Sequence, residues 1–215
     1  MFSIENLGKM NDRLMGFWKL VYLNILWILF TLLGFGIFGI GPATYAITKY
    51  FDQWFRLKNE PPVFKTFWKY YKERFKQSVL VSWILIAVSY ILIVNLFNLT
   101  TWYLQVANIL AFLVLVVGGT HVYTVMAALT FETIPEIVRA SIMMGVGYLH
   151  YTIILWTVLL GFQYVLSITY PSLLFLFGTG FMSAAIVFVG KRIIVDFEDD
   201  TIEGKENKKM ILKGE

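Results

Sequence analysis

The chain of 215 residues contains no cysteine, and three long stretches of it contain no charged side chain. The absence of cysteine excludes disulfide bonds, thiolate metal ligands and thiol nucleophiles. The uncharged stretches are Leu20–Thr48, Gln77–Phe131 and Ala140–Gly190. A soluble domain carries about 25% charged residues, whereas this chain carries 15% and confines them to the segments between these stretches. We therefore expect lipid, rather than water, to surround most of the chain.

The lengths of the uncharged stretches predict how many helices cross the membrane. A transmembrane helix needs roughly 20 apolar residues, so the first stretch holds one span with a remainder, and each of the others holds two spans. The predicted fold is all-α: a polytopic transmembrane helix bundle with five full spans and a short sixth membrane helix after a Gly-Pro break. We expect an interfacial or cytosolic N-terminal arm (1–19), one transmembrane helical domain (20–190) and a charged cytosolic C-terminal tail (191–215).

The Gly-Pro break falls in residues 34–42, where four glycines and one proline occur together. Both residue types are poor helix formers, so this segment predicts a turn or an unwound stretch near the outer face. In lipid, broken backbone survives only when it is buried in protein or faces water. The helix that follows is short and carries Lys49, which leaves two interpretations: six membrane segments, or five with the N-terminal arm outside.

The distribution of Lys and Arg predicts the orientation. The N-terminal arm holds three of these residues, the segment 49–76 holds eight and the tail holds six, whereas the predicted turns 98–103 and 169–171 hold none. Positive charge marks the cytoplasmic side of a membrane protein. We favour six segments in the cell (plasma) membrane with both termini cytoplasmic, because no Lys or Arg then lies outside. The net charge of +4 reports this orientation and does not indicate nucleic-acid binding.

Residues 63–76 combine aromatic and basic side chains at helical spacing. Phe64, Phe67, Trp68, Tyr71 and Phe75 fall on one face of a helix, with lysines and an arginine between them. This pattern is typical of a helix that lies in the headgroup plane. A solvated cytosolic hairpin is the alternative.

A few residues stand out as candidates for function. Lys49 and Asp52 are three residues apart and can pair on one helix face; at membrane depth such groups are often functional, although Lys49 can also extend to the inner headgroups. His121 lies in an uncharged span, where it would relay a proton, bind a ligand or hydrogen-bond to another helix. Together with the break, these observations give the candidate residues Gly39, Gly41, Pro42, Lys49, Asp52 and His121.

The sequence lacks the motifs of known catalytic and cofactor sites. The glycines at 34, 36 and 39 spell the dinucleotide-binding fingerprint by letters, but they interrupt an apolar helix and no strand precedes them. P-loop, nucleophile-elbow and metal-hydrolase motifs do not occur, and the two histidines have no carboxylate near them in sequence. We expect no enzymatic activity, no cofactor and no metal.

Three segments carry a resemblance to a known family. Leu23-Asn-Ile-Leu-Trp27, Gly39-Ile-Gly-Pro-Ala-Thr44 and the aromatic and basic segment from Phe64 are similar to the YesL-like family of bacterial integral membrane proteins. Where relatives often have a proline before Ile-Gly-Pro, this chain has Gly34–Phe38. The resemblance implies a plasma-membrane protein of Bacillus-type bacteria, whose genes often neighbour those of carbohydrate ABC uptake systems. It carries over no catalytic residue.

Two functional hypotheses follow. The first is a non-enzymatic accessory or regulatory partner of a carbohydrate (ABC-type) uptake system, which contacts transporter subunits, or a second copy of itself, within the lipid bilayer through small-residue helix faces. The alternative is a small solute transporter or channel with its site at the broken helix 34–42.

Overall fold

The computed structural model describes residues 4–131 and 133–213, and the side-chain environments of residues 14–131, 133–174 and 176–196. The described residues form helices joined by turns and short loops, without a strand. This confirms the predicted all-α fold. The helices are α1 (Ile4–Leu33), α2 (Ile40–Phe55), α3 (Val63–Glu73), α4 (Phe75–Asn98), α5 (Trp102–Ala128), α6 (Ile134–Gly147), α7 (Leu149–Thr169) and α8 (Pro171–Lys213).

Five segments of these helices are long and apolar enough to cross a membrane, as the sequence predicts. They are Leu14–Leu33, Phe75–Asn98, Trp102–Ala128, Leu149–Thr169 and Leu176–Asp196. The short sixth helix is α2, which has 16 residues and is therefore shorter than a full span.

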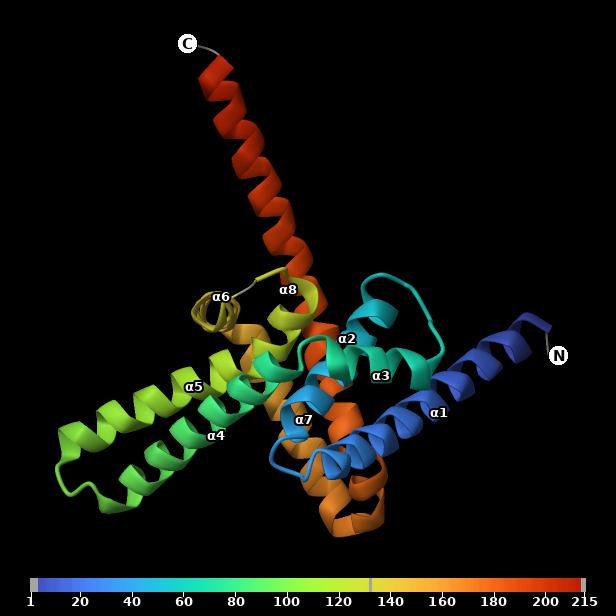
Figure 1. The fold of residues 1–215 in the computed structure, drawn as a ribbon, viewed down its shortest axis with the longest axis horizontal. Helices are drawn as coiled ribbons and strands as arrows, with labels where there is room; N and C mark the ends of the chain where they lie inside the picture. The colour runs from blue at the N-terminus through green and yellow to red at the C-terminus, as the bar shows by residue number, and fades with distance from the viewer. Residues whose placement is uncertain (1–3, 132, 214–215) are drawn as a thin grey trace.

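The helices form three hairpins, α1–α2, α4–α5 and α7–α8, with α3 and α6 as the connecting helices between them (Figure 1). In Figure 1 the loops before α3 and α6 lie towards the top, and the turns of the three hairpins lie lower. Most charged residues outside the two ends of the chain belong to the α2–α3 and α6 side. The predicted orientation, which places this side in the cytoplasm, stays a prediction.

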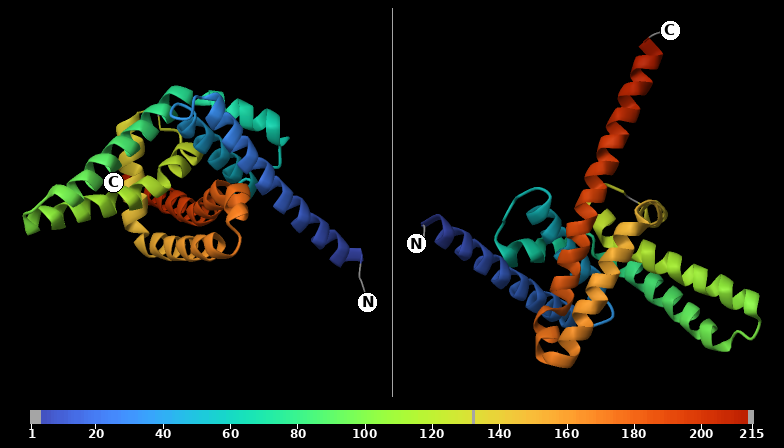
Figure 2. Two further views of the ribbon diagram at one scale, coloured as in Figure 1. Left: turned by 90° about the horizontal axis from the view of Figure 1, so that it is seen from below. Right: turned by 180° about the vertical axis from the view of Figure 1, so that it is seen from behind.

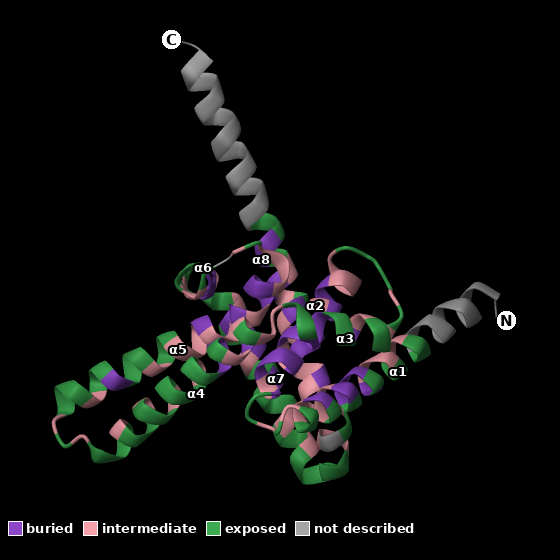
Figure 3. Cartoon of the chain, in the orientation of Figure 1, coloured by how far each residue is buried: buried purple, intermediate pink, exposed green. Residues whose placement is uncertain are grey.

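The hairpins are splayed rather than bundled in parallel. Both views of Figure 2 show α4 and α5 extending away from the other helices as an isolated pair. Only 11% of the most apolar window of α4 is buried within the protein, and Figure 3 shows the outer half of the hairpin as largely exposed. Lipid or another protein must therefore cover most of this hairpin.

The core is centred on α2, of which ten of 16 residues are buried. Helices α1, α3, α4, α5 and α8 all contact it. One apolar cluster joins Phe30 of α1 to Tyr50 and Phe51 of α2 and to α3, and a second joins Tyr45 of α2 to Val81 of α4 and to α5, α6 and α8.

The predicted boundaries of the arm and the tail do not coincide with the ends of helices. Helix α1 runs without interruption from Ile4 to Leu33, and α8 continues to Lys213, so the expected boundaries at residues 19 and 190 fall inside helices. No proline occurs within α1 or after the first residue of α8, and charged residues alone do not stop a helix.

A close contact between helices involves Gly41 of α2. A Cβ atom at this position would lie 2.2 Å from the carbonyl oxygen of Ser78 and 2.7 Å from Oγ of Ser82, both on α4. We expect Gly41→Ala to separate α2 from α4 and to lower the free energy of unfolding by about 1–3 kcal/mol or more. Thermal unfolding of the detergent-purified protein measures this change.

The matched control is Gly161→Ala on α7. A Cβ atom at Gly161 would meet nothing within 4 Å, so alanine is expected to be neutral or to stabilise the helix by up to about 1 kcal/mol. Equal stability of both variants would contradict the close α2–α4 contact.

Candidate functional site

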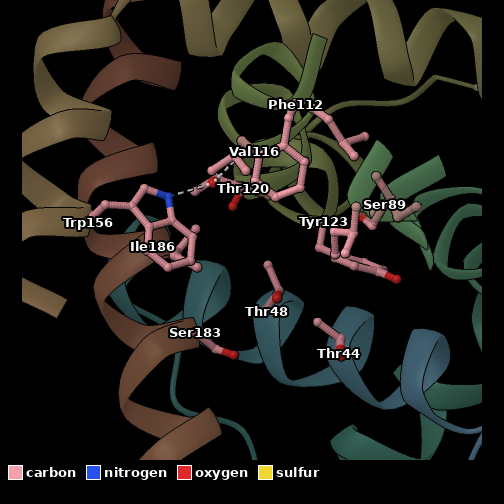
Figure 4. Close-up of a pocket in the computed structure, with 15 residues that line it drawn as sticks. Thr44, Thr48, Ser89, Phe112, Val116, Thr120, Tyr123, Trp156, Ser183 and Ile186 are labelled. Atoms are coloured by element: carbon pink, nitrogen blue, oxygen red, sulfur yellow. Dashed lines mark hydrogen bonds between the residues drawn. The ribbon is translucent and has the colours of Figure 1, made fainter. Parts of the chain in front are cut away.

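A pocket among the membrane helices lies between the α4–α5 hairpin and α7–α8, with α2 on a third side (Figure 4). Its volume is about 430 Å³. We call it the central pocket; its lining residues are Thr44, Thr48, Leu85, Ser89, Ile93, Phe112, Leu115, Val116, Gly119, Thr120, Tyr123, Thr124, Trp156, Ser183 and Ile186.

The central pocket is uncharged but not wholly apolar. None of its described lining residues is Asp, Glu, Lys or Arg, whereas seven of the fifteen carry a hydroxyl group. Helical periodicity places these groups: Thr44 and Thr48 are four residues apart on α2, and Thr120 and Thr124 are four apart on α5. Each pair therefore presents two hydroxyl-bearing side chains on one helix face.

Indole groups anchor two of these hydroxyls across helices. Nε1 of Trp27 on α1 donates to Oγ1 of Thr44 at 3.0 Å, and Nε1 of Trp156 on α7 donates to Oγ1 of Thr120 at 2.9 Å. Both threonines donate in turn to a carbonyl of their own helix. Oγ1 of Thr124 is buried without a hydrogen-bond partner among the described residues. Two hydroxyls of the pocket are thus held in place by hydrogen bonds between helices, within a wall that otherwise includes many apolar side chains.

The described lining residues offer hydroxyl groups and aromatic rings. The pocket has no acid and base pair for proton transfer, and within the described residues no three His, Asp or Glu side chains gather as a metal site. Hydroxyls and aromatic rings can hold a neutral hydroxyl-bearing molecule. Small and hydroxyl side chains also allow another transmembrane helix to pack closely.

The glycine-proline break lies away from this pocket. Residues 34–39 form a turn in which Phe35, Ile37 and Phe38 are exposed, Phe35 by 90%, whereas Gly39 is buried. Both Phe35 and Gly36 have positive φ angles. Gly39 packs on the end of α1, where a Cβ atom would lie 2.4 Å from the carbonyl oxygen of Thr31. Gly41 and Pro42 are buried in α2. These three candidates thus form a turn and a helix contact, and none of them lines the central pocket.

Lys49 and Asp52 have other partners than each other. Oδ1 and Oδ2 of Asp52 accept hydrogen bonds from Arg56 at 2.8 and 2.9 Å. Nζ of Lys49 donates to Glu73 on α3 at 2.5 Å and to the hydroxyl of Tyr45 at 3.1 Å. The lysine therefore ties α2 to α3, and the Asp52–Arg56 pair neutralises a carboxylate that is 1% exposed.

His121 is fully buried and joins two helices. Its Nε2 atom lies 2.9 Å from Oγ1 of Thr152 on α7, and its Nδ1 atom has no partner among the described residues. The side chain does not line the central pocket, although Thr120 beside it does. Of the roles considered for this histidine, the geometry gives the hydrogen bond between helices.

The aromatic face of α3 is covered by protein only in part, since Phe64 and Trp68 are 54% and 40% exposed. Phe67, Tyr70 and Tyr71 are buried, and the ring of Phe30 on α1 lies 5.1 Å from the rings of both Phe67 and Tyr71. The basic side chains of α3 remain outside. Burial raises the pKa of the Tyr71 hydroxyl, which donates to the carbonyl oxygen of Phe30.

The loop before α3 is held by Glu60. Its carboxylate pairs with Lys19 of α1 and accepts a hydrogen bond of 2.7 Å from Nε1 of Trp54. The hydrogen bond from Lys19 is the main reason why the pKa of Glu60 lies below its ordinary value. This contact fixes the connection between α2 and α3 to the first span.

Sequence reasoning did not identify the central pocket. The available signal was the repeat of hydroxyl residues at a spacing of four in uncharged helices, at Thr44 and Thr48 and again at Thr120 and Thr124. It could not show that the two pairs face each other, because that depends on how the hairpins splay.

The His121–Thr152 contact predicts a stability difference. Thr152→Val keeps the side-chain shape but leaves both ring nitrogens of His121 without a partner, so we expect a loss of about 1–3 kcal/mol in the free energy of unfolding. Thr157→Val is the matched control, because the exposed Thr157 hydroxyl donates only to the carbonyl oxygen of Ile153 on its own helix. Thermal unfolding in detergent compares the two; equal midpoints would show that the α5–α7 bond contributes nothing.

Comparisons with known proteins place the chain in a family. The family described as "Protein of unknown function, DUF624" matches residues 20–96. Three proteins of Bacillus subtilis (strain 168) are similar to the chain. "Uncharacterized protein YteU" is 32% identical over 153 residues, which cover 69% of this chain and 68% of that protein. "Uncharacterized protein YesL" is 33% identical over 78 residues, covering 36% and 37%, respectively. "Uncharacterized protein YesV" is 40% identical over 57 residues, covering 26% and 27%.

No solved structure matches the chain. The match to residues 20–96 includes α2, α3 and the α2–α4 contact, which together form the centre of the fold. The resemblance seen in the sequence is confirmed, and the chain belongs to the YesL-like family, DUF624.

Proposed function

We propose that this multi-pass membrane protein is a non-enzymatic accessory partner of a carbohydrate uptake system of the ABC type, located in the cell membrane. Its five apolar helices are those of a membrane protein. The link to carbohydrate uptake rests on the gene neighbourhoods that the family resemblance implies. The central pocket, which has no acid and base pair, supports a binding role rather than an enzymatic one.

The observation that carries the proposal is the opening between the splayed hairpins. Its walls include Ser89 of α4, Gly119 of α5 and Ser183 of α8. Small and hydroxyl side chains let helix backbones approach closely and offer hydrogen bonds across the contact. A transmembrane helix of a transporter subunit would fill the opening and cover the apolar flank of the α4–α5 hairpin, most of which the protein itself leaves exposed.

A second candidate function is the passage or sensing of a small neutral solute. The pocket favours it because hydroxyls lie beside the rings of Tyr123, Trp156 and Phe112. The place differs from the broken helix 34–42 considered from the sequence, since that segment does not line the pocket. A solute site would thus be lined by α2, α4, α5, α7 and α8.

Filling the central pocket tests the proposal. We expect Ser89→Trp to abolish the recovery of transporter subunits when the tagged protein is purified from native membranes, because the indole occupies the space of the partner helix. Ser167→Trp adds the same bulk at an exposed site of α7 and should retain the subunits. Mass spectrometry of the purified material measures both.

Three outcomes would contradict this proposal. Recovery of a homo-oligomer alone from native membranes would remove the accessory role. Retention of the transporter subunits by both tryptophan variants would show that the pocket is not their binding site. Uptake of a neutral sugar into vesicles that contain only this protein, blocked by Ser89→Trp but not by Ser167→Trp, would support the solute function instead.

The predicted orientation has its own test. We expect alkaline phosphatase fused before Met1 to be inactive in cells, and the same enzyme inserted after Leu99, in the turn between α4 and α5, to be active outside. The reason is that the charged side of the bundle, with α3 and α6, should remain in the cytoplasm. Phosphatase activity of the fusion at Met1 would overturn the arrangement with both termini inside.

A further inference from the structure

A second cleft lies at the corner where α3 meets α4. Its volume is about 690 Å³, and it opens on the side of the molecule that carries the connecting helices. Its lining residues include Lys72, Glu73, Arg74, Lys76, Leu80 and Ile134. None of them lines the central pocket, so the two sites are separate.

The cleft carries an excess of positive charge. Helix α3 ends at Glu73 and α4 begins at Phe75, so the bend at Arg74 brings Lys72, Arg74 and Lys76 to one corner. The acidic residue among those named, Glu73, is paired with Lys49, which does not line the cleft. Its charge is therefore already neutralised, and the cations of the cleft are left to attract an anion.

Two further features favour an anion at this corner. No side chain caps the first turn of α4, and that turn holds no acidic residue, so its backbone N–H groups can donate to an anion. Nη1 of Arg74 is buried without a hydrogen-bond partner among the described residues. The guanidinium group is thus incompletely satisfied by the protein.

Apart from Gln77, the remaining lining residues are apolar, and they lie at the predicted membrane boundary. Phe75 is the first residue of a candidate membrane span, and Leu80, one and a half turns further along it, is 53% exposed. Ile134 contributes from the start of α6. Cations beside apolar surface at the end of a span match the two parts of a phospholipid, a phosphate and its acyl chains.

We propose that this cleft binds the headgroup of an anionic membrane phospholipid. Lys72, Arg74 and Lys76 hold the phosphate, while Leu80 and Ile134 contact the upper part of an acyl chain. The lipid then bridges α4, which belongs to the second hairpin, to the connecting helix α6. The site is independent of the proposed accessory role, because it uses neither the central pocket nor a protein partner.

Lipid binding to the detergent-purified full chain tests the proposal, with native mass spectrometry as the readout. We expect phosphatidylglycerol to bind more tightly than phosphatidylcholine. The triple variant Lys72→Gln/Arg74→Gln/Lys76→Gln should weaken phosphatidylglycerol binding on the order of a hundredfold, since each basic residue near a membrane surface accounts for about fivefold.

The matched control is Lys58→Gln/Lys65→Gln/Lys69→Gln. It removes the same number of charges from exposed positions on the same side of the molecule, none of which lines the cleft. We expect this control to bind phosphatidylglycerol within about fivefold of the unmodified protein. An equal loss of phosphatidylglycerol affinity in the two triple variants, or equal affinity for the two lipids, would overturn the proposal. Either result would show that lipid binding does not depend on the cleft.

A soluble phosphate compound could bind the same basic residues as a lipid phosphate. If millimolar glycerol 3-phosphate displaces phosphatidylglycerol completely, the cleft is a site for a soluble phosphate and the lipid proposal fails. Should the cleft triple variant fail to remain monodisperse, Lys76→Gln against Lys69→Gln repeats the comparison with one charge each. A loss of about fivefold is then expected for Lys76→Gln alone.

Discussion

The structure depends on one short helix being buried on nearly all sides. Helix α2 is too short to cross a bilayer by itself, yet α1, α3, α4, α5 and α8 all contact it. Its small residues permit this. Gly41 lets the backbone of α4 approach at Ser78, and Ala43 and Ala46 are fully buried within the apolar cluster that α2 shares with α1, α3 and α8. A helix with larger side chains at these positions could not be surrounded by so many neighbours.

Side-chain hydrogen bonds then hold the hairpins in register. Asn24 of α1 accepts from the backbone N–H of Gly180 on α8 at 2.9 Å, and Asn108 of α5 donates to the carbonyl oxygen of Leu92 on α4 at 2.9 Å. The bonds of Trp27, Trp156 and His121 serve the same purpose between other helices. Because water is absent from the bilayer core, apolar contact alone does not select one arrangement there, and such bonds specify the neighbours.

The sequence was sufficient to predict the helical class, the five spans and α2, since uncharged length and the glycine-proline break are local properties. It was also sufficient to place His121 in a span and to list bonding to another helix among its roles. It was not sufficient to predict which charged side chains pair. Asp52 pairs with Arg56 one helical turn away, and Lys49 pairs with Glu73, which is 24 residues further along the chain. The central pocket could not be predicted for the same reason, because its walls come from five helices whose crossing angles are set by packing.

The attachment of the α4–α5 hairpin is confined to one end. The buried residues of α4 are Ser78, Val81 and Ser82, all within its first third, and most of those of α5 lie between Gly118 and Met126, near its end. The hairpin is therefore packed against the rest of the protein at one end only, and its other end is exposed. Exposed aromatic residues at its tip, Trp102 and Tyr103, are of the kind that anchors a helix at the membrane surface, so the tip should follow the position of that surface. A change in bilayer thickness that moves the tip would thus also move α4 and α5, whose side chains line the central pocket.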